Sequence, residues 1–588
     1  SSTKLQVQGM IRIKDQNQGV LFDPWYFLSQ KRRELMEQSW AGLFRKELLR
    51  ELPVDEVASS FKEDFGRPTK ELYTVLGVLL LQQAHDLTDD ETVNQLAFNI
   101  QWHYALNITD ESDSSKYMCT KTLWNMRHIV IENSLDTILF DRFTDKLAML
   151  FNCNIDNQRI DSVHIKSNMR RLGRIGIFVS TIRKFLVNVK RNHKELFDAI
   201  DAGIRDKYLS EKSLQCFAMV KPSESSKTLA SVSSDLFDLV EQFKSYPEIK
   251  SMLSFKLLQR VLNEQCNVSD DGKQVEVKKP KEIPSDSLQN PSDPDATYSG
   301  HKGQGYQVQV METYCKDGES DNSLNLITHV EVEPSHESDA NALLPAIESA
   351  KQHNVSPEEV LADSLYGSDE NCQKAAELGV RVIAPTMGSI KKEDHLSLSD
   401  FESSENGIVL ACPQGHAPIQ TKTNKAGTRH TATFDSQNCT ACPFQETCPV
   451  KQGKKNHYLR YKTKEMRLAK RRAYEQTDEF KDHYRWRAGV EAAMSEFDRK
   501  TGVKHLRVRG LKAVRFCATM KATAINLFRA TAVQKAINRA KAPQEGGASA
   551  RIHPIIVFKE HFFLALTRLK KVFCIFPRYY EPMPIMAV

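Results

Sequence analysis

The segment GYQVQVMETYCKDGESDNSLNLITHVEVEP, residues 305–334, decides the fold class. Tyr306, Val308 and Val310 alternate with more polar neighbours, and the residues from Leu326 to Val332 alternate in the same way. Alternation with a period of two is typical of strands that turn one face toward a core. We therefore expect two strands, paired antiparallel across a turn formed by KDGESDN.

Helices and strands alternate around this hairpin. The expected elements are, in chain order, a strand RIDSVHI over 159–165, the hairpin, a helix over 338–352, a strand ending in VLAD at Asp363, a helix over 369–378 and a strand VRVIAP over 380–385. This order predicts an α/β core with a mixed five-stranded sheet that is interrupted twice.

The remaining segments differ in composition. The first 150 residues are typical of helices, with a capping box over Thr88–Glu91, and fit a helix-turn-helix-like DNA-binding unit and a plain helical bundle equally well. The expected domains are a helical N-terminal DNA-binding or dimerisation domain (1–150), core elements (151–170 and 300–395), a helical insertion plus linker (171–299), a four-cysteine insertion (396–460), a basic helical segment completing the core (461–540) and a tail without an assigned role (541–588).

Charge and hydropathy limit the class of protein. No apolar run approaches the roughly 18 residues that a membrane span needs, and no apolar segment follows the first basic residues as in a secretory signal. We therefore expect a cytoplasmic protein with no membrane partner. The chain carries a net charge of +6, but residues 451–530 hold 22 Lys and Arg against 8 Asp and Glu. A region with this excess of positive charge is a candidate for binding a polyanion.

Two aspartates lie in predicted strands. Asp161 falls within the strand over 159–165, on the same side as Val163 and Ile165. Asp363 follows an apolar stretch at the carboxyl end of another strand. Ligand sites in open α/β sheets gather at such ends, so the two side chains can be neighbours although 202 positions separate them. Taken singly, each aspartate is more often a turn or cap residue.

A third carboxylate lies in YRWRAGVEAAMSEFDRK, residues 484–500. Its apolar residues recur at helical spacing and predict a buried stripe formed by Trp486, Val490, Met494 and Phe497. Glu491 belongs to the neighbouring stripe. Arg487 lies four residues before Glu491, and its guanidinium can hold a phosphate. The pattern predicts a carboxylate that projects from a well-anchored helix.

Tyr484, Arg487 and Glu491 match a Y-x2-R-x3-E-x6-K signature in type and spacing. With RIDSVHIKSN, DPDATYSGHKGQGYQVQV, LADSLYGSDEN and TGVKHLRVRGLKAV, the chain resembles the bacterial insertion-sequence DDE transposases over roughly residues 35–530. The signature lysine is replaced by Asp498, followed by Arg499 and Lys500. The resemblance implies a ribonuclease-H-like core.

The resemblance also implies a reaction. Asp161 would be shared by two Mg2+ or Mn2+ ions, and Asp363 and Glu491 would each hold one. The activity would be cleavage at the element ends and strand transfer into target DNA. The implied partners are double-stranded DNA, both terminal inverted repeats and target, and a second protomer that helps to hold two ends, on the bacterial nucleoid.

Several residues are expected to contact DNA. Tyr484 and Arg487 would grip a terminal phosphate or a flipped base near the cut. Basic residues beyond the glutamate are expected to bind phosphates, namely Lys500, Lys504, Arg507, Arg509, Lys512 and Arg515. Two alternatives share these features: a DNA-binding protein derived from a transposase that no longer cuts, and a metal-dependent nuclease that cuts without joining. Retention of all three carboxylates favours an active transposase, whereas Asp498 favours a non-cutting one.

Four cysteines form the pattern C-x26-C-x2-C-x5-C, at Cys412, Cys439, Cys442 and Cys448. A distant thiolate plus a tight knuckle suits a closed tetrahedral zinc site, with His416 as a substitute ligand. A redox C-x-x-C pair is the competing interpretation, but it leaves two of the cysteines unexplained. We expect a zinc-ribbon-like insertion whose metal has a structural role and takes no part in cleavage.

Overall fold

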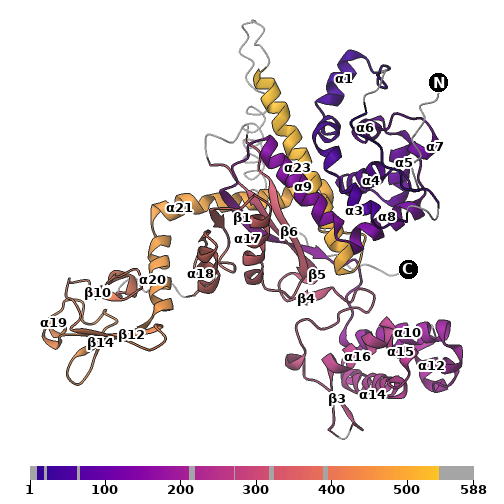
Figure 1. Ribbon diagram of the computed structural model, residues 1–588. Coiled ribbons are helices and arrows are strands. Elements are labelled where there is room, and N and C mark those ends of the chain that lie inside the picture. Colours follow the sequence, from indigo (N-terminus) through magenta and orange to yellow (C-terminus); the bar gives the residue numbers. More distant parts are fainter. Residues whose placement is uncertain are drawn as a thin grey trace, which may run out of the picture. The chain divides into compact units, whose positions relative to one another are not determined.

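The computed structural model describes residues 10–18, 23–62, 67–210, 217, 219–270, 272–316, 323–388 and 395–541 (Figure 1). The expected tail therefore lies outside the described residues. None of the helices described combines the length and the hydrophobicity that a membrane span requires.

A mixed sheet with the order β4-β5-β1-β7-β8, and with β6 also paired to β5, confirms the predicted α/β core. Its strands are β1 (Asn157–Lys166), β4 (Thr297–Ser299), β5 (Gly303–Thr313), β6 (Ile327–Pro334), β7 (Glu359–Leu361) and β8 (Arg381–Ile383). β5 and β6 form the predicted antiparallel hairpin, β5 also pairs antiparallel with β1, and β1, β7 and β8 are mutually parallel. The short β4 is the sixth strand, one more than the sequence predicts, because Thr297–Ser299 of the expected linker pairs with the first residues of β5.

The two faces of the sheet are covered by different helices. Val163 and Val308 belong to a large core that also contains residues of the N-terminal helices and of the last helix. On the other face, Ile160 and Met311 pack against α17 (Leu343–Gln352) and α18 (Asp369–Glu377). The predicted helix over 338–352 begins later, at Leu343, because Asp339–Asn341 forms a 3-10 turn capped by the Ser338 side chain.

The N-terminal region is helical, as predicted. Its elements are α1 (Gln30–Glu37), α2 (Trp40–Leu43), η1 (Phe44–Leu48), η2 (Leu49–Glu51), α3 (Val54–Ala58), α4 (Leu72–Ala84), α5 (Asp89–Phe98), α6 (Ile100–Ala105), α7 (Asp113–Lys116), α8 (Thr120–Glu132) and α9 (Leu135–Leu150). The capping box of Thr88 and Glu91 is present. α5 and α6 are separate helices, because the Asn99 side chain accepts the amides of Gln101 and Trp102 and starts α6.

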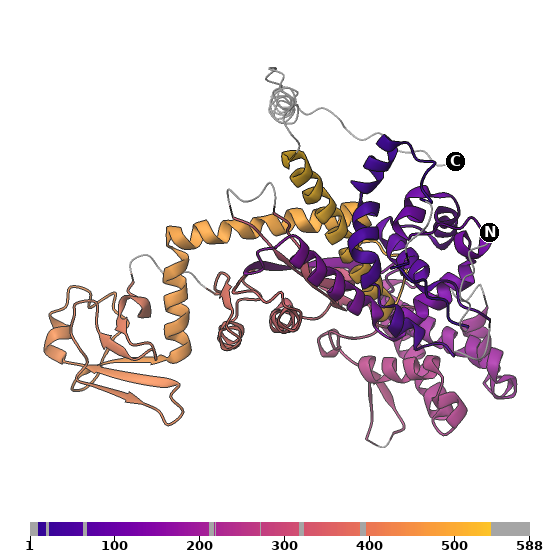
Figure 2. The same cartoon turned by 45° about the horizontal axis from the view of Figure 1, so that its top comes forward.

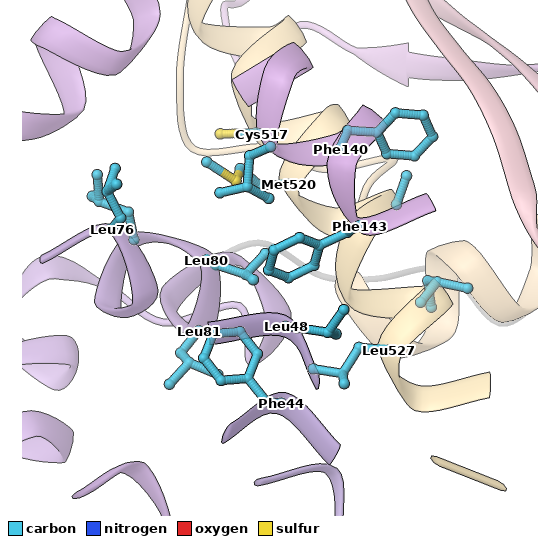
Figure 3. Close-up of a cluster of buried hydrophobic side chains, with 14 of the residues drawn as sticks. Phe44, Leu48, Leu76, Leu80, Leu81, Phe140, Phe143, Cys517, Met520 and Leu527 are labelled. Atoms are coloured by element: carbon cyan, nitrogen blue, oxygen red, sulfur yellow. The ribbon is translucent and has the colours of Figure 1, made fainter. Parts of the chain in front are cut away.

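A shared apolar core joins this region to the last helix, α23 (Leu511–Lys541). Figure 3 shows Leu76 and Leu80 of α4 and Phe143 of α9 in one cluster with Met520 and Leu527 of α23. All five side chains are fully buried. Burial of side chains of this size stabilises the fold by about 1.5–3 kcal/mol each.

The helical insertion has an apolar core of its own, centred on residues such as Phe185, Leu236 and Phe255. Its elements are α10 (Arg174–Asn192), α11 (Lys194–Asp198), α12 (Ala202–Leu209), η3 (Pro222–Glu224), α14 (Ser225–Phe243), α15 (Pro247–Lys250), α16 (Leu253–Gln265), β2 (Cys266–Val268), β3 (Val275–Val277) and η4 (Pro280–Glu282). The chain enters and leaves it at one place, where Ser167 Oγ donates to Asp293 Oδ2 over 2.6 Å.

The four-cysteine insertion contains a second sheet, with the order β11-β12-β14-β13 (Figure 1). Its elements are η6 (Leu398–Asp400), β9 (Glu402–Ser403), β10 (Val409–Ala411), β11 (Gln420–Thr423), β12 (Arg429–Phe434), α19 (Ser436–Thr440), β13 (Lys451–Gln452) and β14 (His457–Lys462). A small core that includes Phe401, Phe434 and Leu459 packs on one side of this sheet.

The segment that carries Glu491 is less regular than its spacing predicts. It comprises α20 (Thr463–Glu475), α21 (Asp478–Tyr484), the 3-10 turn η7 (Arg485–Ala488) and α22 (Gly489–Thr501). The chain changes direction sharply between α20 and α21 (Figures 1 and 2). Val490, Met494 and Phe497 are buried as predicted. Trp486 is not part of a continuous helical stripe, because it lies in η7, its ring stacks on Tyr314, and its carbonyl accepts a hydrogen bond of 2.7 Å from Arg159.

Gly489 makes that contact possible. A Cβ atom built at this position would lie 2.1 Å from Arg159 Nη1. The Arg159 guanidinium is held by Glu312 as well as by the Trp486 carbonyl and has no room to move aside without losing a bond.

We expect Gly489→Ala to destabilise the protein by about 1–3 kcal/mol, because the added methyl group overpacks a close contact. Thermal and denaturant unfolding of the purified variant would measure this loss. Gly300→Ala is the matched control, since nothing lies within 4 Å of a Cβ at Gly300. Equal stabilities of the two variants would contradict a tight contact at Gly489.

Candidate active site

Asp161 and Asp363 lie at equivalent positions of two adjacent parallel strands. β1 and β7 are in register from Asn157 with Glu359 to Arg159 with Leu361, and each aspartate follows two residues later. The pKa of Asp161 is raised, mainly by burial and in smaller part by the carboxylates of Asp363 and Asp339, while Arg487 opposes the shift. The sheet thus brings together two carboxylates that are distant in sequence.

The Asp363 side chain also has a local role. Its Oδ1 accepts the backbone amide of Leu365 over 2.8 Å and that of Tyr366 over 3.4 Å. These bonds fix the carboxylate at the end of β7 and stabilise the following turn. The turn interpretation of Asp363 and a functional role of its carboxylate are therefore compatible.

Arg487 links Asp161 to Glu491. Its Nη2 donates to Asp161 Oδ2 over 2.9 Å, and its Nη1 lies 3.8 Å from Glu491 Oε1. The Glu491 side chain is 76% exposed, whereas those of Arg487 and Asp161 are each 19% exposed. The guanidinium thus offsets the negative charge of the site. In the described part of the chain, no three His, Cys, Asp or Glu side chains lie close enough together to hold one metal ion.

Tyr484, the first residue of the signature, lies near the same carboxylates. Burial raises the pKa of its phenol, the charges of Asp363 and Asp161 raise it further, and Arg487 lowers it. Its ring stacks on Phe480 with centroids 5.3 Å apart. The signature tyrosine and arginine therefore both border the carboxylates.

A buried ion-pair network anchors the elements that carry Asp161 and Glu491. Arg159 on β1 donates to Glu312 Oε1 on β5 over 2.7 and 2.8 Å, and Arg529 on α23 donates to Glu312 Oε2 over 2.8 Å. Arg529 also lies 2.8 Å from Glu496 on α22. The Glu312 side chain is 1% exposed. Strand, hairpin and helix are thereby joined through charged groups that have little access to water.

A second polar network lies on the face of the sheet that α17 covers, and it was not predicted from the sequence. Lys302 Nζ donates to Ser162 Oγ and Gln307 Oε1 over 2.9 Å each and lies 3.2 Å from Asp339 Oδ2. Gln309 Nε2 donates to Asp339 Oδ1 over 3.0 Å, and Gln309 Oε1 accepts from the Tyr366 hydroxyl over 2.6 Å.

The sequence signal for this network is weak. Gln307 and Gln309 are the polar members of an alternating strand, and such residues usually face solvent. Here they are 1% and 0% exposed, because α17 covers that face of the sheet. Their amides need polar partners, which the lysine and the aspartate supply.

The basic residues expected at phosphates mostly have acidic partners within the chain. Lys500 pairs with Glu496, Lys504 with Asp498, Arg507 with Asp86, Lys512 with Glu132 and Arg515 with Asp136, over distances between 2.6 and 3.7 Å. Arg509 instead donates to the Met169 sulfur over 3.4 Å. Asp498, the departure from the signature, also accepts the backbone amide of Lys504 and so stabilises the turn after α22.

The four cysteines line one pocket, together with His416 and His457. Burial raises the pKa of Cys439 to about 11, and the neighbouring thiols of Cys448, Cys412 and Cys442 contribute to the shift. His457 is 3% exposed, and both of its ring nitrogens lack a hydrogen-bond partner among the residues described. None of the four cysteines is in a disulfide.

Comparison with protein-family models gives two matches. Residues 35–128 match a transposase domain, and residues 411–531 match a transposase DDE domain. No curated protein matches the chain. The second match contains Glu491 and the four cysteines, and a DDE domain implies the ribonuclease-H-like fold with which the mixed sheet agrees. The two matches in one chain support an insertion-sequence DDE transposase.

Proposed function

We propose that this transposase cuts DNA at the ends of its element and joins the freed 3′ ends to target DNA. The observation that carries the proposal is the convergence of Asp161 and Asp363 on adjacent strands, with Glu491 linked to Asp161 through Arg487. Strand joining requires a site that binds a nucleophilic oxygen and a scissile phosphate together. An exposed glutamate beside two clustered aspartates is suited to that task.

The donor set fits divalent cations of the Mg2+ or Mn2+ class. Carboxylate oxygens are the ligands such ions prefer, and burial together with the charge of Asp363 raises the pKa of Asp161, as expected where carboxylates share a site. We propose that Asp161 contacts two ions and that Asp363 and Glu491 contact one each. When bound, the ions activate the attacking oxygen and offset charge on the leaving oxygen.

Arg487 has two candidate partners in this scheme. In the structure its guanidinium binds Asp161 and approaches Glu491. We propose that it exchanges these carboxylates for a DNA phosphate when substrate binds, since a planar guanidinium suits both oxyanions equally. Tyr484 would contact the same DNA end, because it lies beside the same carboxylates.

The remaining expected DNA contacts follow the same logic. Lys500, Lys504, Arg507, Arg509 and Lys512 would reach DNA only after exchanging or sharing the partners described above. Two element ends must be held during joining, so we propose that two protomers act together on nucleoid DNA, with residues 1–150 providing DNA binding or dimerisation.

We also propose that Cys412, Cys439, Cys442 and Cys448 bind a structural zinc ion. The four thiols line one pocket, and burial together with the neighbouring thiols raises the pKa of Cys439 and of Cys448. His457 faces the same pocket without a partner in the described chain. Bound zinc would draw the four thiolates of this pocket together and so stabilise the insertion.

Asp363→Asn is expected to abolish cleavage and to leave DNA binding intact, because it keeps the shape of the side chain and removes the charge. The assay is incubation with Mg2+ and a plasmid carrying the gene's own flanking DNA, followed by mapping of new 3′ ends and of joined products. Asp286→Asn is the control, an exposed aspartate of the helical insertion region. Cleavage by Asp363→Asn at the wild-type rate would exclude this carboxylate from the site.

The DNA products of this assay also distinguish the transposase from the two alternative functions. Joined products distinguish a transposase from a nuclease that only cuts. Binding without cuts in Mg2+ or Mn2+ would identify a non-cutting DNA-binding protein.

Cys442→Ser is expected to lower the zinc content from about one ion per chain toward zero and to reduce the thermal stability of the insertion. Elemental analysis of the purified protein measures the first effect, and differential scanning calorimetry the second. Cys119→Ser is the control, since Cys119 is exposed and belongs to the N-terminal helical region. Unchanged zinc content in Cys442→Ser, or wild-type protein without zinc, would refute the site.

A further inference from the structure

The sheet of the four-cysteine insertion has one apolar face and one basic face. His430, Ala432 and Phe434 of β12 and Leu459 and Tyr461 of β14 are all buried against the small core. Because side chains alternate along a strand, the residues between them project from the opposite face. The basic residues on that face are Lys422 of β11, Arg429 of β12, Lys451 of β13, and Arg460 and Lys462 of β14, and all five are exposed.

Strand pairing places these cations close to one another. Lys422 is opposite Thr431, and Thr431 is opposite Arg460 on the next strand. Arg429 is directly opposite Lys462. Neighbouring strands are about 4.8 Å apart, and same-face positions along a strand about 6.6 Å apart. The cations therefore form a compact group on a flat surface, in which like charges repel one another without a partner.

The basic face has no acidic residues to balance it. Residues 418–434 and 449–464 contain nine Lys and Arg and no Asp or Glu. Within the described ranges, none of the five cations on the face forms an ion pair, in contrast to Lys500, Lys504, Arg507 and Lys512. A solvated surface normally mixes both signs of charge. The absence of mixing indicates a polyanionic partner.

We propose that this basic face binds the phosphate backbone of duplex DNA, as a contact separate from the carboxylate site. The proposal rests on the proposed function for its partner, because it takes DNA to be the substrate. Duplex DNA carries one negative charge per about 1.7 Å of axis, so a flat group of cations meets several phosphates at once. Arg460 also lies over the ring of Tyr458, 5.8 Å from its centroid, which orients the guanidinium.

The chemistry of the face favours phosphates over bases or lipid. Its other side chains are Gln420, Thr431, Thr433 and Tyr458, which offer hydroxyl and amide groups. A membrane surface would require several large apolar side chains among the cations, and the only aromatic ring among the side chains named for this face is that of Tyr458, over which Arg460 lies. The major groove admits a helix or a two-stranded ribbon, whereas the cations of this face are spread over four strands. We therefore expect binding that does not depend on sequence.

The test is the triple variant Lys422→Gln/Arg429→Gln/Arg460→Gln. All three side chains are exposed and lie outside the core, so the insertion should keep its fold, which circular dichroism and zinc content would verify. The matched control is Lys194→Gln/Lys250→Gln/Lys256→Gln, which removes the same charge from exposed positions of the helical insertion. Binding to a short duplex of arbitrary sequence is measured over a range of salt concentrations, without Mg2+ or Mn2+ so that no cleavage occurs, and without a chelator that would remove the zinc.

We expect the slope of log affinity against log salt to become shallower by about 2.7 in the triple variant, because each lost phosphate contact removes about 0.9. Affinity near 0.1 M salt should fall on the order of 100-fold. The control should keep the wild-type slope, and the charge-conserving variant Lys422→Arg/Arg429→Lys/Arg460→Lys should bind like wild type. An unchanged slope in the triple variant, or an equal loss in the control, would overturn the proposal.

The binding assay does not depend on catalysis. A wild-type protein that binds through this face but never cuts in Mg2+ would overturn the proposed reaction and leave the face intact. A protein that cuts and joins DNA while its triple variant keeps the wild-type salt slope would overturn only the face.

Discussion

The geometry of the candidate active site depends on the buried ion pairs of Glu312. This one carboxylate, 1% exposed, accepts hydrogen bonds from Arg159 of β1 and Arg529 of α23, and Arg529 continues to Glu496 of α22. Charges so far from water are tolerated only when they are paired, and removal of one member typically costs about 3–5 kcal/mol. Asp161 lies two residues beyond Arg159, and Glu491 lies five residues before Glu496 on the same helix. The network therefore fixes two of the three carboxylates through their own backbone segments.

Periodicity and strand ends were sufficient to predict the core of the site. The alternation around Val308 and Val330 defines the central hairpin, and the observed register confirms it. Asp161 and Asp363 could be placed together because parallel strands end at one edge of a sheet, and their register positions agree with that argument. The capping box at Thr88 could be predicted because it depends only on local bonds. Each of these features depends either on residues close together in the sequence or on the regular repeat of side chains along a strand.

Features that depend on distant partners could not be predicted. The 3-10 turn before Glu491 presents the Trp486 carbonyl to Arg159, which lies more than 300 positions away in the sequence. Gln307 and Gln309 have the spacing of solvent-facing residues, yet Lys302 and Asp339 pair with them under a covering helix. The basic residues after Glu491 have the composition of a DNA-binding segment, but most of them neutralise acidic residues brought close by the fold. Composition gives the number of charges and not their partners.

The hydrogen bond between Ser167 and Asp293 joins the two ends of the helical insertion, and this affects the order in which the chain folds. β1 must pair with β5 across about 140 intervening residues, a large loop to close by diffusion. The insertion has its own core, and once it is folded Ser167 and Asp293 are joined, which leaves only a dozen or so residues to bridge. On the logarithmic dependence of closure entropy on length, that shortening lowers the cost of the first long-range strand pair by about 2 kcal/mol. The insertion thus acts as an internal scaffold that draws the strand carrying Asp161 toward its partner.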